Sequence, residues 1–365
     1  MYLPHADRMQ DLERLAPDLG WYQLSSQIDC FPSTRFMGSK EKLLHPLWRA
    51  IGQFAPRRVL DLCSGSGVVS YMLKAQGCEV IANDQMAMAT TIAEALISNS
   101  ESRLTEEEVG RIAGHALPGG KIWNIYADLY YDRADVEFLD HARMVVKTLP
   151  NEKRAIATAA LIRACIKRRP RGIFTYTGRR YDDGRKDLKF TLSEHFEIAV
   201  AQLNAAVFNN GRESKVTQVD LSSGFPDVDV DVVYLDPPYY SPLSDNHYVR
   251  RYHFTEALAK DWKGVRIQED TKTKKIENYT NPFSSEISCS QVIERTLDRY
   301  EKTPVVLSYG SNSLPSASTI IQIMERHGRK CELREVDHRY SFANQATASQ
   351  PVRNQVKELI FIALP

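Results

Sequence analysis

The chain has 365 residues, of which 43% are hydrophobic and 25% are charged, a composition that is ordinary for a globular protein. This length accommodates one large α/β domain with a substantial insert, or two modest domains. No apolar run approaches the roughly 20 residues that cross a bilayer, and the N-terminal residues lack the features of a secretory signal. We therefore expect no membrane association and a cytoplasmic location. The six cysteines form no CxxC pair and are expected to remain reduced thiols.

The formal net charge of +1 conceals a local imbalance. Thirteen lysines and arginines but only four acidic residues lie between positions 147 and 189. A basic segment within a more acidic chain is typical of a localised contact with a polyanion. It is equally typical of a solvated helix face, and charge alone does not decide between the two.

The clearest local unit covers residues 57–84. The apolar run RRVLDLC predicts a buried parallel strand, SGSG a tight turn, and VVSYMLKAQG a helix. CEVIAND then predicts a second strand. Strand, glycine-rich turn, helix and strand in this order predict a βαβ unit.

Residues 86–214 have mainly helical patterns, among them NEKRAIATAALIRACIKR at 151–168. The α/β alternation then resumes. Strands are predicted at KVTQVD, DVVYLD and TPVVLSYG, and helices at HFTEALAKDW, SQVIERTLDRYEK and SASTIIQIMERHG. The tail, QVKELIFIAL, predicts a last strand at an antiparallel edge of the sheet.

This order predicts an α/β fold, a Rossmann-like, doubly wound and mainly parallel sheet with one mostly helical insert. We expect the sheet domain to comprise residues 1–100 and 212–365, and the inserted domain to comprise residues 101–211.

Two glycines and an acidic strand end indicate a nucleoside-binding site. Gly65 and Gly67 let the backbone turn sharply where the first strand enters its helix. Ser70 stands where the dinucleotide fingerprint has Gly or Ala, which disfavours a pyrophosphate ligand. Asp84 ends the next strand, where its carboxylate can accept hydrogen bonds from a ribose diol. Asp220 ends KVTQVD, where it either receives an adenine amino group or only serves as an N-cap or Asx-turn ahead of LSSG.

The four residues Asp236, Pro237, Pro238 and Tyr239 follow the apolar strand VVYL. The amino group of a nucleobase is a poor nucleophile because its lone pair is delocalised into the ring. Two acceptors, the Asp236 carboxylate and the Pro237 carbonyl, can hold both amino hydrogens and direct the lone pair at a sulfonium methyl group. Tyr239 offers a face for stacking a base, which must be flipped out of a duplex to reach this motif.

These motifs resemble those of the Dam-like (D12 class) DNA adenine-N6 methyltransferases, and the resemblance covers most of the chain. It implies S-adenosylmethionine as the cofactor and adenine N6 in double-stranded DNA as the target. The family's N-terminal cofactor motif, an aromatic residue followed by glycine and lysine, is similar to FMGSK at 36–40. Its cofactor loop corresponds to residues 61–67, in which Cys63 replaces the usual Phe and alters the packing of the cofactor's methionine end.

The resemblance also implies roles for individual residues. The implied cofactor-binding residues are Phe36, Met37, Gly38, Lys40, Asp61, Cys63, Ser64, Gly65, Gly67, Asp84, Asp220 and Asp236. The implied catalytic residues are Asp236, Pro237, Pro238 and Tyr239.

The family places target recognition between the second strand and the strand before DPPY, where the basic insert lies. A glycine-punctuated part of this insert suits phosphate and stacking contacts. It carries Arg179, Arg180, Arg185, Lys186 and Lys189 interleaved with Tyr176 and Tyr181. The preceding helix, with Arg163, Lys167, Arg168 and Arg169, is a weaker candidate, because it could equally present a solvated face.

After DPPY, a polar and aromatic loop carries Arg250 and Arg251 beside Tyr248 and Tyr252. Such a loop can close over a flipped base and neutralise flanking phosphates. His247 and His253 have no third ligand at a suitable spacing, so no metal site is expected.

Other functions stay open. An RNA adenine methyltransferase would use the same chemistry, and a DNA-binding protein with a vestigial site would fail to bind the cofactor. DPPY rather than SPPY favours adenine over cytosine N4. Protein-glutamine methyltransferases usually have NPPY, and Ser70 disfavours a nicotinamide dehydrogenase. We expect a monomer or weak dimer, either an orphan methylase or part of a restriction–modification system with a cognate restriction endonuclease as a candidate partner.

Overall fold

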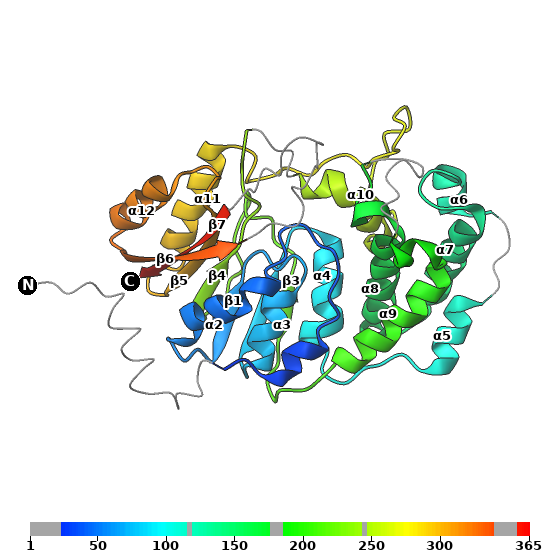
Figure 1. Cartoon of the computed structure of the whole chain (residues 1–365), viewed down its shortest axis with the longest axis horizontal. Helices are drawn as coiled ribbons and strands as arrows, with labels where there is room; N and C mark the ends of the chain where they lie inside the picture. Colours follow the sequence, from blue (N-terminus) through cyan, green and yellow to red (C-terminus); the bar gives the residue numbers. More distant parts are fainter. Residues whose placement is uncertain (1–22, 115–118, 176–184, 243–246, 339–355) are drawn as a thin grey trace, which may run out of the picture.

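The computed structural model describes residues 23–114, 119–175, 185–242, 247–338 and 356–365. This part of the chain forms a seven-stranded sheet in the order β3-β2-β1-β4-β5-β7-β6, with helices on both faces (Figure 1). The strands are β1 Arg58–Asp61, β2 Glu79–Asn83, β3 Lys215–Thr217, β4 Val232–Leu235, β5 Val305–Gly310, β6 Lys330–His338 and β7 Val356–Leu364. Strands β1 to β5 pair in parallel, which confirms the predicted α/β class.

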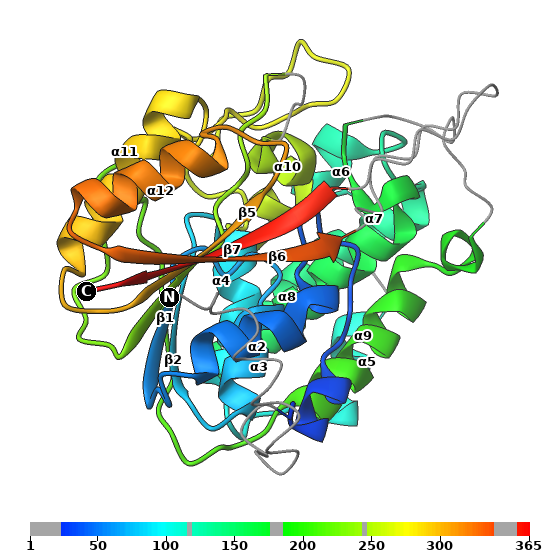
Figure 2. The ribbon, with the colours of Figure 1, turned by 60° about the vertical axis from the view of Figure 1, so that its left-hand side comes forward.

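The sheet separates two helical layers. Figure 2 shows α11 (Glu286–Arg299) and α12 (Ala317–Arg326) on one face, and α2 (Leu44–Gly52) and α3 (Val68–Ala75) on the other. The strands alternate between two buried clusters. In β4, Val232 and Tyr234 belong to the α2–α3 side, whereas Val233 and Leu235 belong to the α11–α12 side. Because successive strand residues point to opposite faces, this apolar run fills both cores at once.

The mainly helical insert lies beside the sheet, on the right in Figure 1. It leaves the sheet through α4 (Ala87–Ala93) and the π-helical turn η4 (Glu94–Ser98). Its helices are α5 Glu106–Ala113, α6 Lys121–Tyr126, α7 Arg133–Val146, α8 Asn151–Arg168 and α9 Leu192–Ala206, with short 3-10 turns η5 Pro170–Gly172 and η6 Lys186–Lys189. The predicted helix at 151–168 is confirmed as α8. Buried residues of α4, α8 and α10 (Tyr248–Ala259) belong to one continuous hydrophobic cluster.

The N-terminal part of the described chain adds η2 (Ser26–Cys30) and η3 (Glu41–Leu43), which precede α2. No helix in the described ranges is both long and apolar enough to cross a membrane.

Three predictions about elements were wrong. The last strand, β7, is antiparallel but is not an edge strand, because β6, which the sequence analysis missed, pairs with its outer side. Strand β3 ends at Thr217 and not at Asp220. Arg250 and Arg251 do not lie in a loop, since helix α10 begins at Tyr248.

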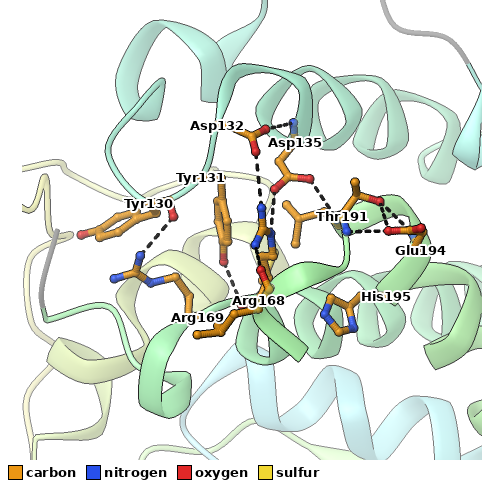
Figure 3. Close-up of polar contacts among 12 residues, drawn as sticks. Tyr130, Tyr131, Asp132, Asp135, Arg168, Arg169, Thr191, Glu194 and His195 are labelled. Atoms are coloured by element: carbon orange, nitrogen blue, oxygen red, sulfur yellow. Dashed lines mark hydrogen bonds and ion pairs between the residues drawn. The ribbon is translucent and has the colours of Figure 1, made fainter. Parts of the chain in front are cut away.

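Arg163, Lys167, Arg168 and Arg169 do not form a solvated face of helix α8, because none of the four is fully exposed. Arg163 and Arg169 are buried, and the Arg163 guanidinium donates to Thr34 Oγ1 at 2.8 Å and to Gln202 Oε1 at 2.8 Å. Arg168 pairs with Asp135 at 3.1 Å and with Asp132 at 3.4 Å (Figure 3). Arg163, Arg168 and Arg169 therefore hold α8 against neighbouring segments. Much of the insert's positive charge is thus engaged in contacts within the protein.

Candidate active site

A cavity opens at the carboxyl ends of β1, β2 and β4, where open α/β sheets bind ligands. Its lining combines apolar side chains with a few convergent carboxylates, which is typical of a small-molecule site. Ten of the residues predicted to bind a cofactor line this cavity: Phe36, Met37, Gly38, Lys40, Asp61, Cys63, Ser64, Gly65, Asp84 and Asp236. The structure thus brings together segments that lie up to two hundred residues apart in the sequence.

The glycine-rich turn and Asp84 are held against each other. Gly65 and Gly67 have φ angles of +49° and +78°, which a glycine adopts without strain. The Asp84 carboxylate accepts hydrogen bonds from the Gly65 N–H at 2.9 Å and from the Met86 N–H at 2.8 Å. Burial raises the pKa of Asp84 to about 6, although these two bonds oppose the shift. Gly67 is not a lining residue and instead begins α3.

Asp61, at the end of β1, has one oxygen engaged and one available. Ser70 Oγ donates to Asp61 Oδ2 at 2.6 Å, while Asp61 Oδ1 is buried and has no hydrogen-bond partner among the described residues. Burial raises the pKa of this carboxyl to about 7, and the nearby Asp236 and Asp84 add to the shift. A buried acceptor without a partner is costly, so this oxygen is suited to receive a donor from a ligand.

The FMGSK segment is fixed against α10. The Phe36 ring stacks on the Tyr252 ring with centroids 5.1 Å apart, and the Met37 N–H donates to the Tyr252 hydroxyl at 2.8 Å. The Tyr248 hydroxyl donates to the Met37 carbonyl at 2.9 Å. Gly38 has a φ of +77°, and a Cβ there would lie 2.5 Å from the Tyr248 hydroxyl oxygen. Tyr248 and Tyr252 therefore position the rim of the cavity.

The DPPY residues lie beside a buried cluster of charges. Lys40 Nζ lies 2.7 Å from Asp236 Oδ1 and 3.6 Å from Glu358 Oε1, and it also lies over the Tyr239 ring at 4.8 Å from its centroid. The Tyr239 hydroxyl lies 3.2 Å from Asp236 Oδ1 and also donates to Glu358 Oε1. Lys40 is 3% exposed, so this ammonium is held almost entirely by the protein.

The cluster sets the charge of Asp236. Burial raises the pKa of Asp236 to about 6; Lys40 opposes this rise and Glu358 reinforces it. Burial alone would lower the pKa of Lys40, but the two carboxylates outweigh burial and the net shift is upward. At neutral pH the cluster therefore contains an ionised Asp236 carboxylate held against an ammonium group.

The other DPPY residues have distinct positions. Pro237 is buried, and Pro238 lines the cavity. The Tyr239 ring packs against Tyr309 with centroids 4.9 Å apart, while the Tyr240 carbonyl accepts from the Leu314 N–H at 2.9 Å. The motif is thus tied on its far side to β5 and the turn that follows it.

Asp220 has the Asx-turn geometry that was one of its two predicted roles. Its Oδ1 accepts from the Ser222 N–H at 2.8 Å, and its carbonyl accepts from the Ser223 N–H at 2.9 Å. Its neighbours Val219 and Leu221 line the cavity. A contact between Asp220 and an adenine amino group stays a prediction.

The residues predicted to bind DNA divide into three groups. Arg179 and Arg180, with Tyr176 and Tyr181, lie outside the described residues. Lys186, Lys189 and Arg250 are exposed. Arg185 and Arg251 are only partly exposed; Arg185 Nη2 donates to the Arg169 carbonyl at 2.8 Å, and the Arg251 carbonyl accepts from the Phe174 N–H at 2.9 Å.

The two histidines differ in their surroundings. His247 lines the cavity, whereas His253 is buried with its Nε2 at 2.9 Å from the Tyr130 hydroxyl. Burial lowers the pKa of His253 to about 3, so this imidazole is neutral. No group of three potential metal ligands occurs within the described ranges.

Several residues that line or support the cavity were not predicted from the sequence. Asn281, Pro282 and Phe283 form part of the cavity wall, and Gln85 Nε2 anchors that segment by donating to the Thr280 carbonyl at 2.7 Å. Their stretch has no helical or strand period, so nothing in the sequence pointed to it. Glu358 could have been noticed, because it is an acidic residue at the start of an otherwise apolar strand.

Comparison with known proteins agrees with this geometry. Residues 36–293 match the family model described as D12 class N6 adenine-specific DNA methyltransferase. The chain is 25% identical over 347 residues to the Type II methyltransferase M2.HphI of Haemophilus parahaemolyticus, an alignment that covers 91% of this chain and 97% of that protein. It is 23% identical over 351 residues to the Type II methyltransferase M.NlaIII of Neisseria lactamica, covering 90% and 98%. The matched region contains the glycine-rich turn, Asp84 and the DPPY motif, and the chain belongs to the D12 class of N6 adenine-specific DNA methyltransferases.

Proposed function

We propose that this protein methylates adenine N6 at a specific site in double-stranded DNA, with S-adenosylmethionine as donor and with the target base flipped out of the helix. One observation carries the proposal: the DPPY carboxylate of Asp236 and the edge formed by Gly65 and Asp84 line the same cavity. A methyl donor bound along β1 and β2 would therefore meet an amino group held at Asp236.

The residues present fit S-adenosylmethionine. The acceptor oxygen Asp61 Oδ1 suits an ammonium group, and the fixed carboxylate of Asp84 suits a ribose diol. With Asp236, these groups give the cavity negative charge that complements a cation. When bound, the cofactor supplies a methyl group carried on a positively charged sulfur.

The chain's own part is to hold the base. Asp236 accepts one amino hydrogen, and the Pro237 carbonyl is the proposed acceptor of the other, so that the nitrogen lone pair is no longer shared with the ring. We propose that the base stacks on Tyr239, which adds about 1–3 kcal/mol in aromatic–base contacts. A buried site in which these dipoles are already oriented favours a reaction that removes charge from sulfur.

We propose that the insert at 101–211 is the target-recognition domain, and that the exposed Lys186, Lys189 and Arg250 contact phosphates. Arg179 and Arg180 lie outside the described residues, and their contact with DNA stays a prediction from the sequence. We further propose that the protein acts in the cytoplasm within a restriction–modification system, since both relatives are Type II methyltransferases. A cognate endonuclease as partner is proposed on the same basis. A monomer or weak dimer stays a prediction.

The test is methyl transfer from labelled S-adenosylmethionine to unmethylated genomic DNA, analysed by nucleoside mass spectrometry. We expect N6-methyladenine from the wild type and none from Asp236→Ala. N4-methylcytosine would overturn the choice of base, and a strong preference for structured RNA would overturn the choice of polymer. Sequencing the modified DNA would identify the recognition site.

A further inference from the structure

A carboxylate occupies a core position of strand β7. Glu358, Ile360 and Ile362 share one face of the strand, and the two isoleucines belong to the buried cluster on the α2–α3 side. Glu358 is fully buried, and its cross-strand partner on β5 is Gly310. Because an unpartnered carboxylate in such a place would be strongly disfavoured, its contacts must compensate for its burial.

Those contacts come from three separate parts of the chain. Ser308 Oγ donates to Glu358 Oε1 at 2.5 Å, and the Tyr239 hydroxyl donates to the same oxygen. The third partner, Lys40 Nζ, lies 3.6 Å away. Glu358 lies outside residues 36–293, so the match to the D12 family gives it no role.

Two carboxylates compete for two donors at this point. The Tyr239 hydroxyl has one proton but lies within reach of both Glu358 and Asp236, and Lys40 also contacts both. In the observed arrangement Lys40 is nearer to Asp236, at 2.7 Å against 3.6 Å, while Tyr239 makes its closer contact with Glu358. Because the single phenol proton can be donated fully to only one carboxylate, the closer contact with Glu358 weakens the hydrogen bond from Tyr239 to Asp236, the carboxylate that the target amine needs.

We propose that Glu358 is a positioning residue for methyl transfer: by binding the Tyr239 hydroxyl and sharing Lys40, it keeps Asp236 available as the acceptor for the amino group. This inference rests on the proposed function, because it assigns to Asp236 the task of holding the amine. It adds a group from β7, the strand that pairs with β5 inside the sheet, to the site formed by the DPPY motif.

The variant Glu358→Gln tests the charge while keeping the shape. In this variant we expect the Tyr239 hydroxyl to donate its hydrogen bond to the remaining carboxylate, Asp236. Lys40 should then pair with Asp236 alone. Asp236 then becomes a weaker and more crowded acceptor. The single-turnover rate of methyl transfer should fall about 10- to 100-fold, while cofactor affinity changes little, because misplacing a reacting group costs rate more than binding.

The pH profile separates positioning from mere support of the fold. Burial raises the pKa of Asp236 and Glu358 adds to the rise, so removing the Glu358 charge lowers that pKa. Since Asp236 must be ionised to accept the amine, the acidic limb of the rate profile should move to lower pH in Glu358→Gln. The titratable and polar groups that interact with this site include Lys40, Asp61, Cys63, Tyr234, Asp236, Tyr239, Tyr248 and Ser308.

The matched control is Glu335→Gln on neighbouring strand β6, which removes an exposed carboxylate paired with Lys357 at 2.6 Å. It should change neither the rate nor the pH profile. A second test is the double variant Glu358→Gln with Tyr239→Phe, which removes the misdirected hydroxyl and should be faster than Glu358→Gln alone. If Glu358→Gln fails to fold, Glu358→Asp keeps a buried charge but shortens its reach and should still lose rate.

The outcomes distinguish this inference from the proposed function. A wild type that makes no N6-methyladenine would overturn both. An active wild type with a Glu358→Gln variant of unchanged rate, or with a slower rate and an unmoved acidic limb, would overturn only the positioning role.

Discussion

Three carboxyl groups give the cavity its electrostatic character: Asp61, which is buried, and Asp84 and Asp236, which are partly exposed. Burial raises the pKa of Asp61 to about 7 and those of Asp84 and Asp236 to about 6. Among the described residues, Lys40 lies beside Asp236, but no lysine is among the main influences on Asp61. A cationic ligand would therefore neutralise the negative charge near Asp61 and Asp84. Burial and mutual repulsion of these carboxylates therefore destabilise the fold, and binding of a cationic cofactor would reduce this destabilisation.

Asp61→Asn should separate stability from binding. The pKa of Asp61 is about 7 in the fold, whereas an unperturbed aspartate has a pKa of 3.8. The stability linked to its protonation is therefore full below about pH 4 and lost as pH rises to 7. Removing the charge should raise Tm at pH 8 by a few degrees, on the order of 1–3 kcal/mol, and by less at pH 5. Cofactor affinity should fall about 10- to 100-fold through loss of a charged hydrogen bond.

Calorimetry at the two pH values and cofactor titration check this prediction. Asp270→Asn, at an exposed position, is the control and should alter neither quantity. An Asp61→Asn variant that melts at a lower temperature than the wild type at pH 8 would contradict the assigned cost.

Gly38→Ala should weaken the cofactor site through Tyr248. Both Gly38 and Gly77 have left-handed backbones, with φ of +77° and +87°, so alanine at either position costs about 1–2 kcal/mol of stability. At Gly38 the new Cβ would also meet the Tyr248 hydroxyl at 2.5 Å, whereas nothing lies within 4 Å at Gly77. We expect both variants to lose similar backbone stability, but only Gly38→Ala to lose cofactor affinity as well. Equal affinities in the two variants would refute a role for the Met37–Tyr248 contact.

At the scale of elements, the basic insert contains two kinds of cation. The Arg169 guanidinium is buried beneath Tyr130 and Phe174, with its carbon 5.0 Å and 5.8 Å from their ring centroids, and it donates to the Tyr130 carbonyl at 3.0 Å (Figure 3). Lys189, by contrast, ends the exposed turn η6. The two residues are close in sequence and alike in charge, but only one is accessible to a polyanion.

Arg169→Ala should therefore affect stability, whereas Lys189→Ala should affect DNA binding. The first should cost about 2–4 kcal/mol of stability through a cavity and an unpaired carbonyl. The second should leave Tm unchanged but weaken DNA binding, and lower the slope of log affinity against log salt by about 1. Thermal unfolding and binding titrations at several salt concentrations measure both effects. A lower Tm with an unchanged salt slope for Lys189→Ala would show that η6 is structural.

The success of sequence-based prediction also varied by element. Strands β1 and β4 are short apolar runs that precede the glycine-rich turn and DPPY, and β2 is an apolar run that ends just before Asp84; the pattern located all three. Strand β6 was missed because its charged residues form surface pairs, such as Arg334 with Glu332 at 2.7 Å, and hide the apolar period. Charged edge strands are a common protection against aggregation. Without β6, nothing in the sequence could show that β7 lies inside the sheet.

The candidate site was predictable to the extent that local motifs define it. Turns and strand ends identified the residues from Asp61 to Asp84 and from Asp236 to Tyr239, because the residues that carry each function are close together in the sequence. The partnership of Lys40 with Glu358 was not predictable, since it joins positions far apart through strand pairing. The packing of Tyr252 on Phe36 was missed for the same reason.

At the scale of the whole molecule, the insert and the sheet share a core. Buried residues of α3, α4, α8 and α10 belong to one cluster, and Glu256 of α10 accepts from the Ala87 and Met88 N–H groups at 3.0 Å and 2.9 Å, at the start of α4. Helix α4 follows directly after Asp84, and α10 carries the tyrosines that hold FMGSK. A ligand at Asp84 therefore contacts elements that also pack on the insert.

We accordingly expect the sheet and the insert to unfold together. Calorimetry should show a single transition, and saturating S-adenosylmethionine at about 100 times its Kd should stabilise that entire transition by about 2.7 kcal/mol. Hydrogen exchange should slow in α8, which does not line the cavity, as well as in α3, because opening either helix would expose the shared core. Asp61→Asn, with an affinity about 10- to 100-fold lower, should be stabilised by only about 0.4–1.4 kcal/mol at the same cofactor concentration and should show correspondingly less slowing of exchange. Two transitions, of which the cofactor moves only one, would mean that α8 packs on the sheet without being energetically coupled to it.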